Sequence, residues 1–253
     1  SAIFITQKNY PKTIQVGSVI GFNTTKLPKI DLLLGGSPCQ DLSTANKGGL
    51  GLHGKRSGLF WEYVRVLQEI KPTYFLFENV PMKKEWSDTI DDALGVRAIE
   101  INSNLVSAQN RLRLYWTNIP NITQPTDMGI TLGDIIYDDT YKVFTHPRIS
   151  VTKMLAKNYV KWDSSGKGYY SQNDRAYFKG KKICTLPKRS PTNKLNIVLD
   201  YERDIYRRMH PIEAERCQNV PDNYTSGLSD RKRLEMLGNG WTVDVIVHIL
   251  KNI

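Results

Sequence analysis

The chain has 253 residues, of which 40% are hydrophobic and 24% charged, and its formal net charge is +10. This is the composition of a globular protein with one large domain, or with one domain that carries a smaller one. No apolar run approaches the roughly 18 residues that cross a membrane, and the first residues lack the basic start and apolar core of a signal peptide. The three cysteines include no CxxC pair, so we expect reduced thiols in a cytoplasmic protein rather than disulfides or a structural zinc site.

The first 120 residues alternate between strand and helix patterns. Short apolar runs at residues 29–34, 73–77, 96–101 and 112–117 predict strands, and a helical stripe of apolar residues covers residues 59–70. Strands that alternate with helices indicate a largely parallel sheet, and therefore an α/β fold.

From residue 121 to 205 the pattern predicts a small, strand-rich insertion. Residues 142–194 hold 13 Lys or Arg residues against two acids, a local net charge of +11, and the rest of the chain has a net charge of −1. Aromatic residues are interleaved with these cations. Phosphate backbones attract such a surface, but a solvated basic face would have the same composition, so charge alone leaves both interpretations open.

Regular patterns return near residue 206. Pro211 after His210 stands at a favourable first position of a helix, with Glu213 in its first turn, and this helix should run to about Gln218. A strongly apolar helix is predicted over residues 242–250, after a Gly-Asn-Gly turn at 238–240.

Two of the predicted strands are each followed by a residue whose side chain could take part in catalysis. Cys39 follows the first strand in the segment GGSPCQ, and Glu78 follows the second in ENV. Ligands of open parallel sheets bind beyond the carboxyl ends of the strands, so this thiol and this carboxylate can meet at one small substrate. A lone cysteine is more often a buried small apolar residue, which is how we interpret Cys184 and Cys217.

These segments resemble the signature blocks of cytosine-C5 DNA methyltransferases of the bacterial and phage type. Further blocks follow in the order of that family. The amino-acid sequence around ENV and QNRLR is also similar to that of animal de novo DNA methyltransferases. Each block is short, but five in the right order are specific: PCQ (38–40), ENV (78–80), QNRLR (109–113), RRMHPIEAERCQ (207–218) and LGNGW (237–241).

The resemblance implies a Rossmann-like methyltransferase domain with a small basic target-recognition domain. We expect the catalytic domain over residues 1–120 and 206–253, and the recognition domain over residues 121–205. The implied reaction transfers a methyl group to C5 of a flipped-out cytosine in duplex DNA. By family position Cys39 is the nucleophile that adds to C6, Glu78 faces the ring N3, and Arg113, with Arg111 beside it, faces the ring O2.

The methyl donor that the resemblance implies is S-adenosylmethionine (AdoMet). By family position its site would include Val19, Pro38, Leu59 and Asn239. The family's glycine-containing first block is absent, and residues 1–19 resemble the helix and strand that follow it. Three explanations stay open: the sequence lacks its start, a separate small chain completes the site, or the protein is a non-catalytic relative that binds DNA.

The resemblance also predicts where duplex DNA binds. The glycine-rich segment after Cys39 is typical of a lid that closes over DNA. The candidate DNA contacts are Ser43, Arg56, Lys161, Arg175, Lys181 and Lys182. The four histidines show no metal-ligand spacing, so we predict no metal.

Two other functions compete with a DNA methyltransferase. One is a tRNA methyltransferase, because a branch of the same family is similar in its motifs. The other is a DNA-binding regulator or scaffold. We interpret Glu213 and Arg216 as a structural pair that supports the active site.

Overall fold

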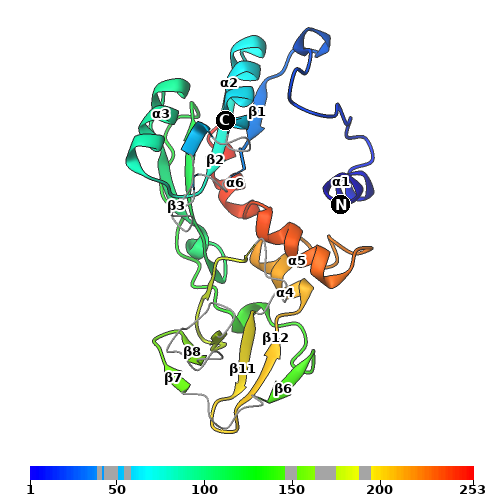
Figure 1. Ribbon diagram of the computed structural model, residues 1–253, viewed down its shortest axis with the longest axis vertical. Helices are drawn as coiled ribbons and strands as arrows, with labels where there is room; N and C mark the ends of the chain where they lie inside the picture. The colour runs from blue at the N-terminus through cyan, green and yellow to red at the C-terminus, as the bar shows by residue number, and fades with distance from the viewer. Residues whose placement is uncertain (39–41, 43–50, 54–57, 146–152, 163–174, 188–194) are drawn as a thin grey trace. The chain divides into compact units, whose positions relative to one another are not determined.

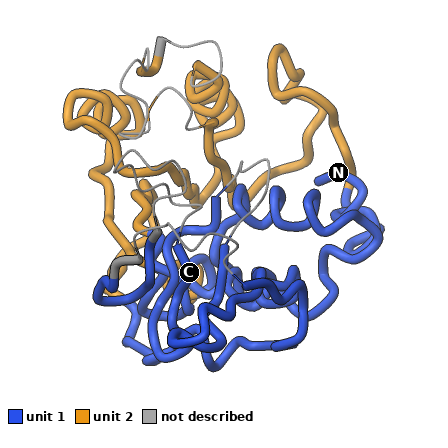
Figure 2. Tube along the Cα trace, turned by 60° about the horizontal axis from the view of Figure 1, so that its bottom comes forward, with its two compact units in different colours: residues 1–13, 103–111, 125–247 blue, residues 14–102, 112–124, 248–253 orange. Residues whose placement is uncertain are grey.

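The computed structural model of the chain is shown in Figure 1, and it describes residues 1–38, 42, 51–53, 58–145, 153–162, 175–187 and 195–253. The chain divides into two compact units, each built from several segments (Figure 2). Unit 1 holds residues 1–13, 103–111 and 125–247, and unit 2 holds residues 14–102, 112–124 and 248–253. The predicted division into segments 1–120, 121–205 and 206–253 follows the chain rather than these units, and it stays a prediction.

Unit 2 is built on a four-stranded sheet with the order β1-β2-β5-β3. β1 pairs in parallel with β2, and β5 pairs antiparallel with both β2 and β3. β1, β2 and β3 therefore run in one direction and β5 runs in the opposite one. The expected largely parallel sheet is correct for three strands and wrong for β5. The strands are β1 (Leu32–Gly35), β2 (Tyr74–Asn79), β3 (Ile99–Asn102) and β5 (Leu112–Thr117).

Helices α2 (Leu59–Ile70) and α3 (Lys84–Leu94) pack with this sheet. The apolar stripe of α2 buries Phe60, Tyr63 and Val64 in a core that also holds Phe77 of β2 and Trp116 of β5. The rings of Phe60 and Phe77 meet edge to face with their centroids 5.3 Å apart, a favourable arrangement of aromatic rings. The short helices of this unit are η1 (Thr24–Lys26) and η2 (Gly51–His53).

Unit 1 contains a six-stranded sheet with the order β6-β12-β11-β9-β8-β7, drawn in the lower half of Figure 1. Neighbouring strands are antiparallel, except that β11 and β9 run parallel. The strand-rich character predicted for the basic segment is thus confirmed. The strands are β6 (Val143–Thr145), β7 (Lys153–Leu155), β8 (Tyr159–Trp162), β9 (Arg175–Tyr177), β11 (Asn196–Asp200) and β12 (Ile205–Arg208).

Apolar clusters form on both faces of this sheet. Tyr177 and Ile197 belong to a large cluster with residues of α4 and η4, whereas Val198 and Tyr206 belong to a smaller one. The other elements of unit 1 are α1 (Ala2–Asn9), η3 (Ser103–Leu105), β4 (Gln109–Asn110), η4 (Gly133–Ile135), β10 (Ile183–Cys184), α4 (Pro211–Cys217) and α5 (Asp230–Asn239). α6 (Val243–Leu250) begins in unit 1 and ends in unit 2.

The local patterns predicted some elements well and others wrongly. α2 and β5 have the predicted bounds, and α4 begins at Pro211 with His210 as its N-cap and Glu213 completing a capping box. The helix expected at the start of the chain is α1, but the strand expected to follow it within residues 1–19 is not formed. The predicted turn at 238–240 is instead the end of α5, a helix too polar to show an apolar stripe.

Candidate functional site

Glu78 and Arg113 form an ion pair at the end of β2. Arg113 Nε lies 3.0 Å from Glu78 Oε1, and each side chain is only 12% exposed. The antiparallel pairing of β5 with β2 brings the two residues together, since Asn79 lies opposite Leu114. Arg113 Nη1 also donates to the carbonyl oxygen of Leu112. The guanidinium and the carboxylate are thus held in one place and are largely shielded from water.

The segment that leads to Cys39 is fastened to the same strand end. Asn79 is buried, and its side-chain amide donates to Ser37 Oγ at 3.0 Å and to the Ser37 carbonyl oxygen at 3.4 Å. Gly36 is packed so closely that a Cβ there would lie 2.9 Å from the Glu78 carbonyl oxygen. Ser37 is two residues before Cys39, which itself lies outside the described residues.

Of the predicted lid after Cys39, the structure describes only Leu42 before it, residues 51–53 within it and Gly58 at its end. Leu42 and Leu52 are buried in the core of unit 2, at 0% and 4% exposure. The candidate DNA contacts Ser43 and Arg56 lie outside the described residues, as does most of the predicted lid.

Three of the candidate AdoMet residues lie in unit 2. Val19 is 41% exposed, and its carbonyl oxygen accepts a hydrogen bond from Arg65 of α2. Pro38 and Leu59 are half-buried, at the end of the segment after β1 and at the start of α2. The apolar side chains of Val16 and Ile20, beside Val19 in sequence, are 55% and 65% exposed. Uncovered apolar side chains suit the flat ring of adenine, so these residues fit the proposed cofactor.

The fourth candidate AdoMet residue, Asn239, is the exposed last residue of α5 in unit 1. Buried Arg111 donates to the carbonyl oxygens on either side of it, those of Gly238 and Gly240. These contacts give Arg111 a structural use in holding the Gly-Asn-Gly segment. Arg113 is therefore the better candidate for a catalytic guanidinium.

Residues of three sequence blocks meet in a buried polar network that was not predicted. The side-chain amide of Gln109 donates to the Cys217 carbonyl oxygen at 2.7 Å and to Gln218 Oε1 at 3.0 Å. Gln218 in turn donates to the Leu237 carbonyl oxygen and accepts from Thr242. Gln109 and Gln218 both belong to the recognised sequence blocks, and this position was the only feature of the sequence that could have indicated their structural role.

The structural pair that we expected between Glu213 and Arg216 is wrong. Glu213 pairs with Arg207 through two hydrogen bonds of 2.7 and 3.0 Å, and both side chains are fully buried. Arg216 pairs with Asp222 instead, with its Nη2 2.7 Å from Asp222 Oδ2. Arg207, the first residue of its sequence block, is therefore the buried cation that neutralises Glu213.

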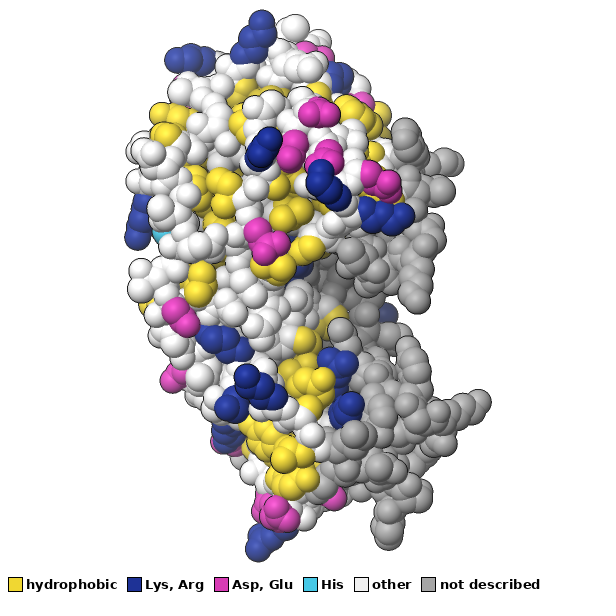
Figure 3. Space-filling model, turned by 90° about the vertical axis from the view of Figure 1, so that its left-hand side faces the viewer, with side chains coloured by type: hydrophobic (Ala, Val, Ile, Leu, Met, Phe, Trp, Pro, Cys, Tyr) yellow, Lys and Arg dark blue, Asp and Glu magenta, His cyan; other side chains and the backbone are white. Residues whose placement is uncertain are grey.

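The candidate DNA contacts in unit 1 differ in their surroundings. Lys181 is exposed, Lys161 is half-buried, and the guanidinium of Arg175 lies 4.8 Å from the ring centroid of Tyr159. Lys182 donates to three backbone carbonyl oxygens, and burial lowers the pKa of its ammonium group. These contacts fix Lys182 inside the unit, and we leave it out of the proposed DNA contacts. Figure 3 shows Lys and Arg side chains beside apolar ones over the part of the face that holds the six-stranded sheet.

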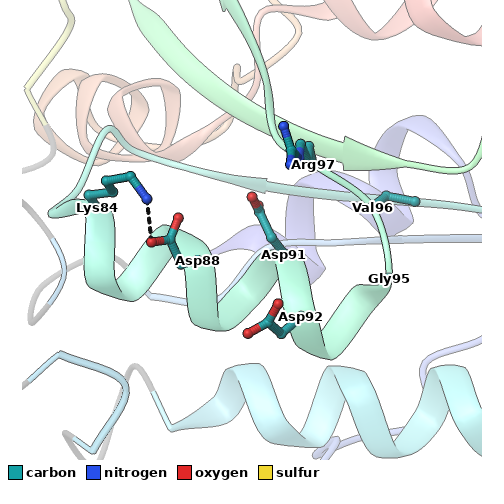
Figure 4. A pocket seen from close by; sticks show the side chains of 7 residues that line it. All are labelled: Lys84, Asp88, Asp91, Asp92, Gly95, Val96 and Arg97. Carbon is teal, nitrogen blue, oxygen red and sulfur yellow. Dashed lines mark hydrogen bonds and ion pairs between the residues drawn. The ribbon is translucent and has the colours of Figure 1, made fainter.

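A pocket of about 660 Å³ lies beside α3 and contains none of the predicted site residues (Figure 4). Lys84 and Asp88 pair across one turn of the helix at 2.6 Å. Asp91 accepts hydrogen bonds from the indole of Trp116 and from the Ala98 backbone. These polar groups thus serve the fold of unit 2.

The cysteines of the described parts lack the exposed, readily ionised thiol that a catalytic cysteine needs. Cys217 is fully buried, and burial raises the pKa of its thiol; burial also raises the pKa of the Cys184 thiol. Within the described ranges, no three His, Cys, Asp or Glu side chains are grouped as metal ligands, and no helix has the length and apolarity to cross a membrane. The interpretation of Cys217 as a buried apolar residue is confirmed.

Comparison with known proteins supports the resemblance inferred from the sequence blocks. The model of the family described as "C-5 cytosine-specific DNA methylase" matches residues 1–91 and 100–253. The chain is 28% identical to Type II methyltransferase M1.ScrFI of Lactococcus lactis subsp. cremoris over 91% of its own length, and it spans 64% of that relative. It is 26% identical to Type II methyltransferase M.NlaX of Neisseria lactamica over 97% of its length, and it spans 82% of that relative.

Among solved structures, the chain is similar to Entamoeba histolytica methyltransferase EhMeth. The TM-score is 0.66 at 17% identity, and the match covers 98% of this chain and 85% of that one. At this identity the likeness concerns the fold alone. The predicted α/β fold and the family are confirmed.

Proposed function

Because the chain belongs to the C-5 cytosine-specific DNA methylase family, we propose that it transfers a methyl group from AdoMet to C5 of a flipped-out cytosine in duplex DNA, through a covalent bond between Cys39 and C6. The observation that carries this proposal is the shielded pair of Glu78 and Arg113. It lies at the strand end to which the segment preceding Cys39 is fastened.

The three side chains have distinct tasks in the proposed reaction. The thiolate of Cys39 forms a bond to C6, and this addition moves an electron pair toward the N3 edge of the ring. Glu78 holds the proton that N3 needs to balance this charge. Arg113 donates to O2 on the neighbouring edge and neutralises the carboxylate that Glu78 becomes once its proton has passed to N3.

The addition makes the ring electron-rich, and its C5 then acts as the nucleophile. AdoMet, when bound, supplies the electrophilic methyl group. We propose that Val19, Pro38 and Leu59 of unit 2 hold it. After a base has removed the C5 proton, the bond between the sulfur of Cys39 and C6 breaks, and the ring regains its double bond.

We place DNA contacts in unit 1 and in the segment after Cys39. Lys161, Arg175 and Lys181 are the proposed contacts among the described residues of unit 1. Since such cations release counterions when they meet phosphates, binding should weaken steeply as salt is raised.

Covalent trapping tests the proposed reaction directly. The protein is incubated with AdoMet and duplex DNA that contains 5-fluorocytosine, with and without an added segment that completes the AdoMet site, and a denaturation-resistant adduct is measured by mass. Fluorine at C5 blocks the final elimination, so Cys39 should stay attached to the base. Cys39→Ala should abolish the adduct, and Cys184→Ala, the matched control, should leave it intact. A methylated product with equal rates for Cys39→Ala and the original protein would reject this mechanism.

The same assay also tests whether a further segment completes the sheet of unit 2, because the outer edge of β1 has no partner strand among the described residues. In the described residues β1 pairs only with β2, and Leu34 of β1 is 40% exposed. We propose that a segment adds to the outer edge of β1 and completes the AdoMet site, and a separate chain is one form that it could take. AdoMet binding by this chain alone, with full affinity in equilibrium dialysis, would contradict this.

Two alternatives predict different results in these experiments. A tRNA methyltransferase would incorporate methyl groups into tRNA rather than into duplex DNA. A regulator would bind duplex DNA with the same affinity whether residue 39 is cysteine or alanine, and would form no adduct. The Glu78–Arg113 pair favours the catalytic reading, because DNA binding alone does not require it.

A further inference from the structure

Adjacent arginines on β12 have opposite surroundings. Neighbouring residues of a strand point to opposite faces of the sheet. Arg207 is fully buried and pairs with Glu213 and Asp139. Arg208 is half-buried on the other face, where Phe144 and Tyr206 belong to the smaller apolar cluster.

Arg208 differs from its neighbours in having no acidic partner among the described residues. Arg207, Arg216 and Arg233 each lie within 3.1 Å of a carboxylate oxygen. For Arg208 no carboxylate of the described parts lies within 4.0 Å, and burial lowers the pKa of its guanidinium group. A half-buried cation of this kind is costly unless an acceptor meets it.

The guanidinium of Arg208 is also held in a fixed orientation. It lies 4.4 Å from the ring centroid of Phe144, and its Nη1 donates to the side-chain oxygen of Asn196, which stands directly opposite on β11. Asn196 is fully buried and donates to the Arg175 carbonyl oxygen at 2.8 Å, so the chain fixes its orientation. Of the five N–H donors of Arg208, the described contacts use one.

A fixed planar fork is better suited to a base edge than to the diffuse charge of a phosphate. Guanine presents two acceptors, O6 and N7, in the major groove, and a bidentate arginine is their commonest specific partner. A rigid guanidinium loses little freedom on binding, whereas an exposed lysine such as Lys181 can follow a phosphate at any position.

We propose that Arg208 reads a guanine in the recognition sequence, with Phe144 and Asn196 as the positioning residues that aim it. This inference rests on the proposed function, because it needs DNA as the substrate. It goes further in naming a residue that determines sequence specificity and the base that it selects.

Selection from a random duplex library tests the proposal without requiring methylation. The bound duplexes are sequenced for the unsubstituted protein, for Arg208→Gln and Arg208→Lys, and for Arg203→Gln as the matched control. Arg203 belongs to the same unit, but its side chain is 80% exposed and lies 3.7 Å from the carboxylate of Asp200. Methylation of the bound pool is mapped in parallel.

The unsubstituted protein should enrich a sequence that contains at least one guanine. Both Arg208 variants should lose preference at one guanine by about 5- to 150-fold and keep their preferences elsewhere. Arg203→Gln should keep all of them. Arg208→Lys retains the charge but lacks the planar fork, so it decides the matter if Arg208→Gln fails to fold.

Three results would overturn the inference. The affinity of the Arg208 variants could fall by the same factor for all sequences, and the slope of log affinity against log salt concentration could become smaller by about one. This is the behaviour of a phosphate contact. The variants could also behave like Arg203→Gln, or the unsubstituted protein could show no sequence preference. Enrichment of a sequence without any methylation, even when a segment that completes the AdoMet site has been added, would instead reject the proposed function and leave the role of Arg208 supported.

Discussion

The buried pair of Arg207 and Glu213 predicts a large loss of stability when either partner is removed alone. Arg207→Ala leaves the carboxylate of Glu213 buried at 0% exposure without its cation. The backbone N–H groups of Tyr137 and His210 still donate to this carboxylate, but they do not neutralise it. Breaking a buried ion pair in this way costs about 3–5 kcal/mol.

This loss is large compared with the total free energy of unfolding of a domain, which is about 5–15 kcal/mol. The matched control is Asp222→Ala, which breaks the pair with Arg216. The side chains of that pair are 40% and 31% exposed, so its loss should cost at most about 1 kcal/mol. The double variant Arg207→Ala/Glu213→Ala should lose less than the sum of its single variants, because it leaves no uncompensated charge.

Urea denaturation followed by tryptophan fluorescence measures these differences. Arg207→Ala should have a much lower denaturation midpoint than Asp222→Ala, at a similar dependence on urea concentration. If the two variants lost equal stability, or if the double variant were additive, the reasoning about the buried charge would be refuted.

Three further predictions concern Gly36, Asp230 and the pair of Lys182 and Lys181. Gly36→Ala should destabilise the protein by about 1–3 kcal/mol and lower the adduct yield, because a Cβ there would lie 2.9 Å from a backbone oxygen of β2; unchanged melting and trapping would contradict this. The pKa of Asp230 is lowered from its ordinary value of 3.8, chiefly by the hydrogen bond from Tyr141. The ionised Asp230 therefore stabilises the fold above pH 3.8, and this contribution is lost as the pH falls through the lowered pKa of the folded state. Asp230→Asn should therefore flatten the acid side of the curve of stability against pH, and an unaltered curve would rule this out. Lys182→Met should cost about 1–3 kcal/mol in urea denaturation, whereas Lys181→Met should leave stability within about 0.5 kcal/mol and weaken DNA binding; equal effects on stability would refute the distinction.

Local patterns in the sequence were sufficient where one element buries one face. The stripe of α2 marked its bounds because apolar residues on a helix must recur with its period, and β5 was marked by a short apolar run. The direction of β5 was not predictable in this way. An antiparallel strand and a parallel one can have the same apolar run, and only the pairing with β2 and β3 distinguishes them.

By itself, the sequence determined the family, through the order of the short blocks, and predicted Cys39, Glu78 and Arg113 as its catalytic residues. Only the tertiary structure decided the partners. It paired Glu213 with Arg207 rather than with Arg216, used Arg111 and Lys182 to hold backbone carbonyls, and left Arg208 without an acid among the described residues. The physical reason is that a charged side chain shows its type in the sequence, whereas its partner is set by contacts between segments that lie far apart in the chain.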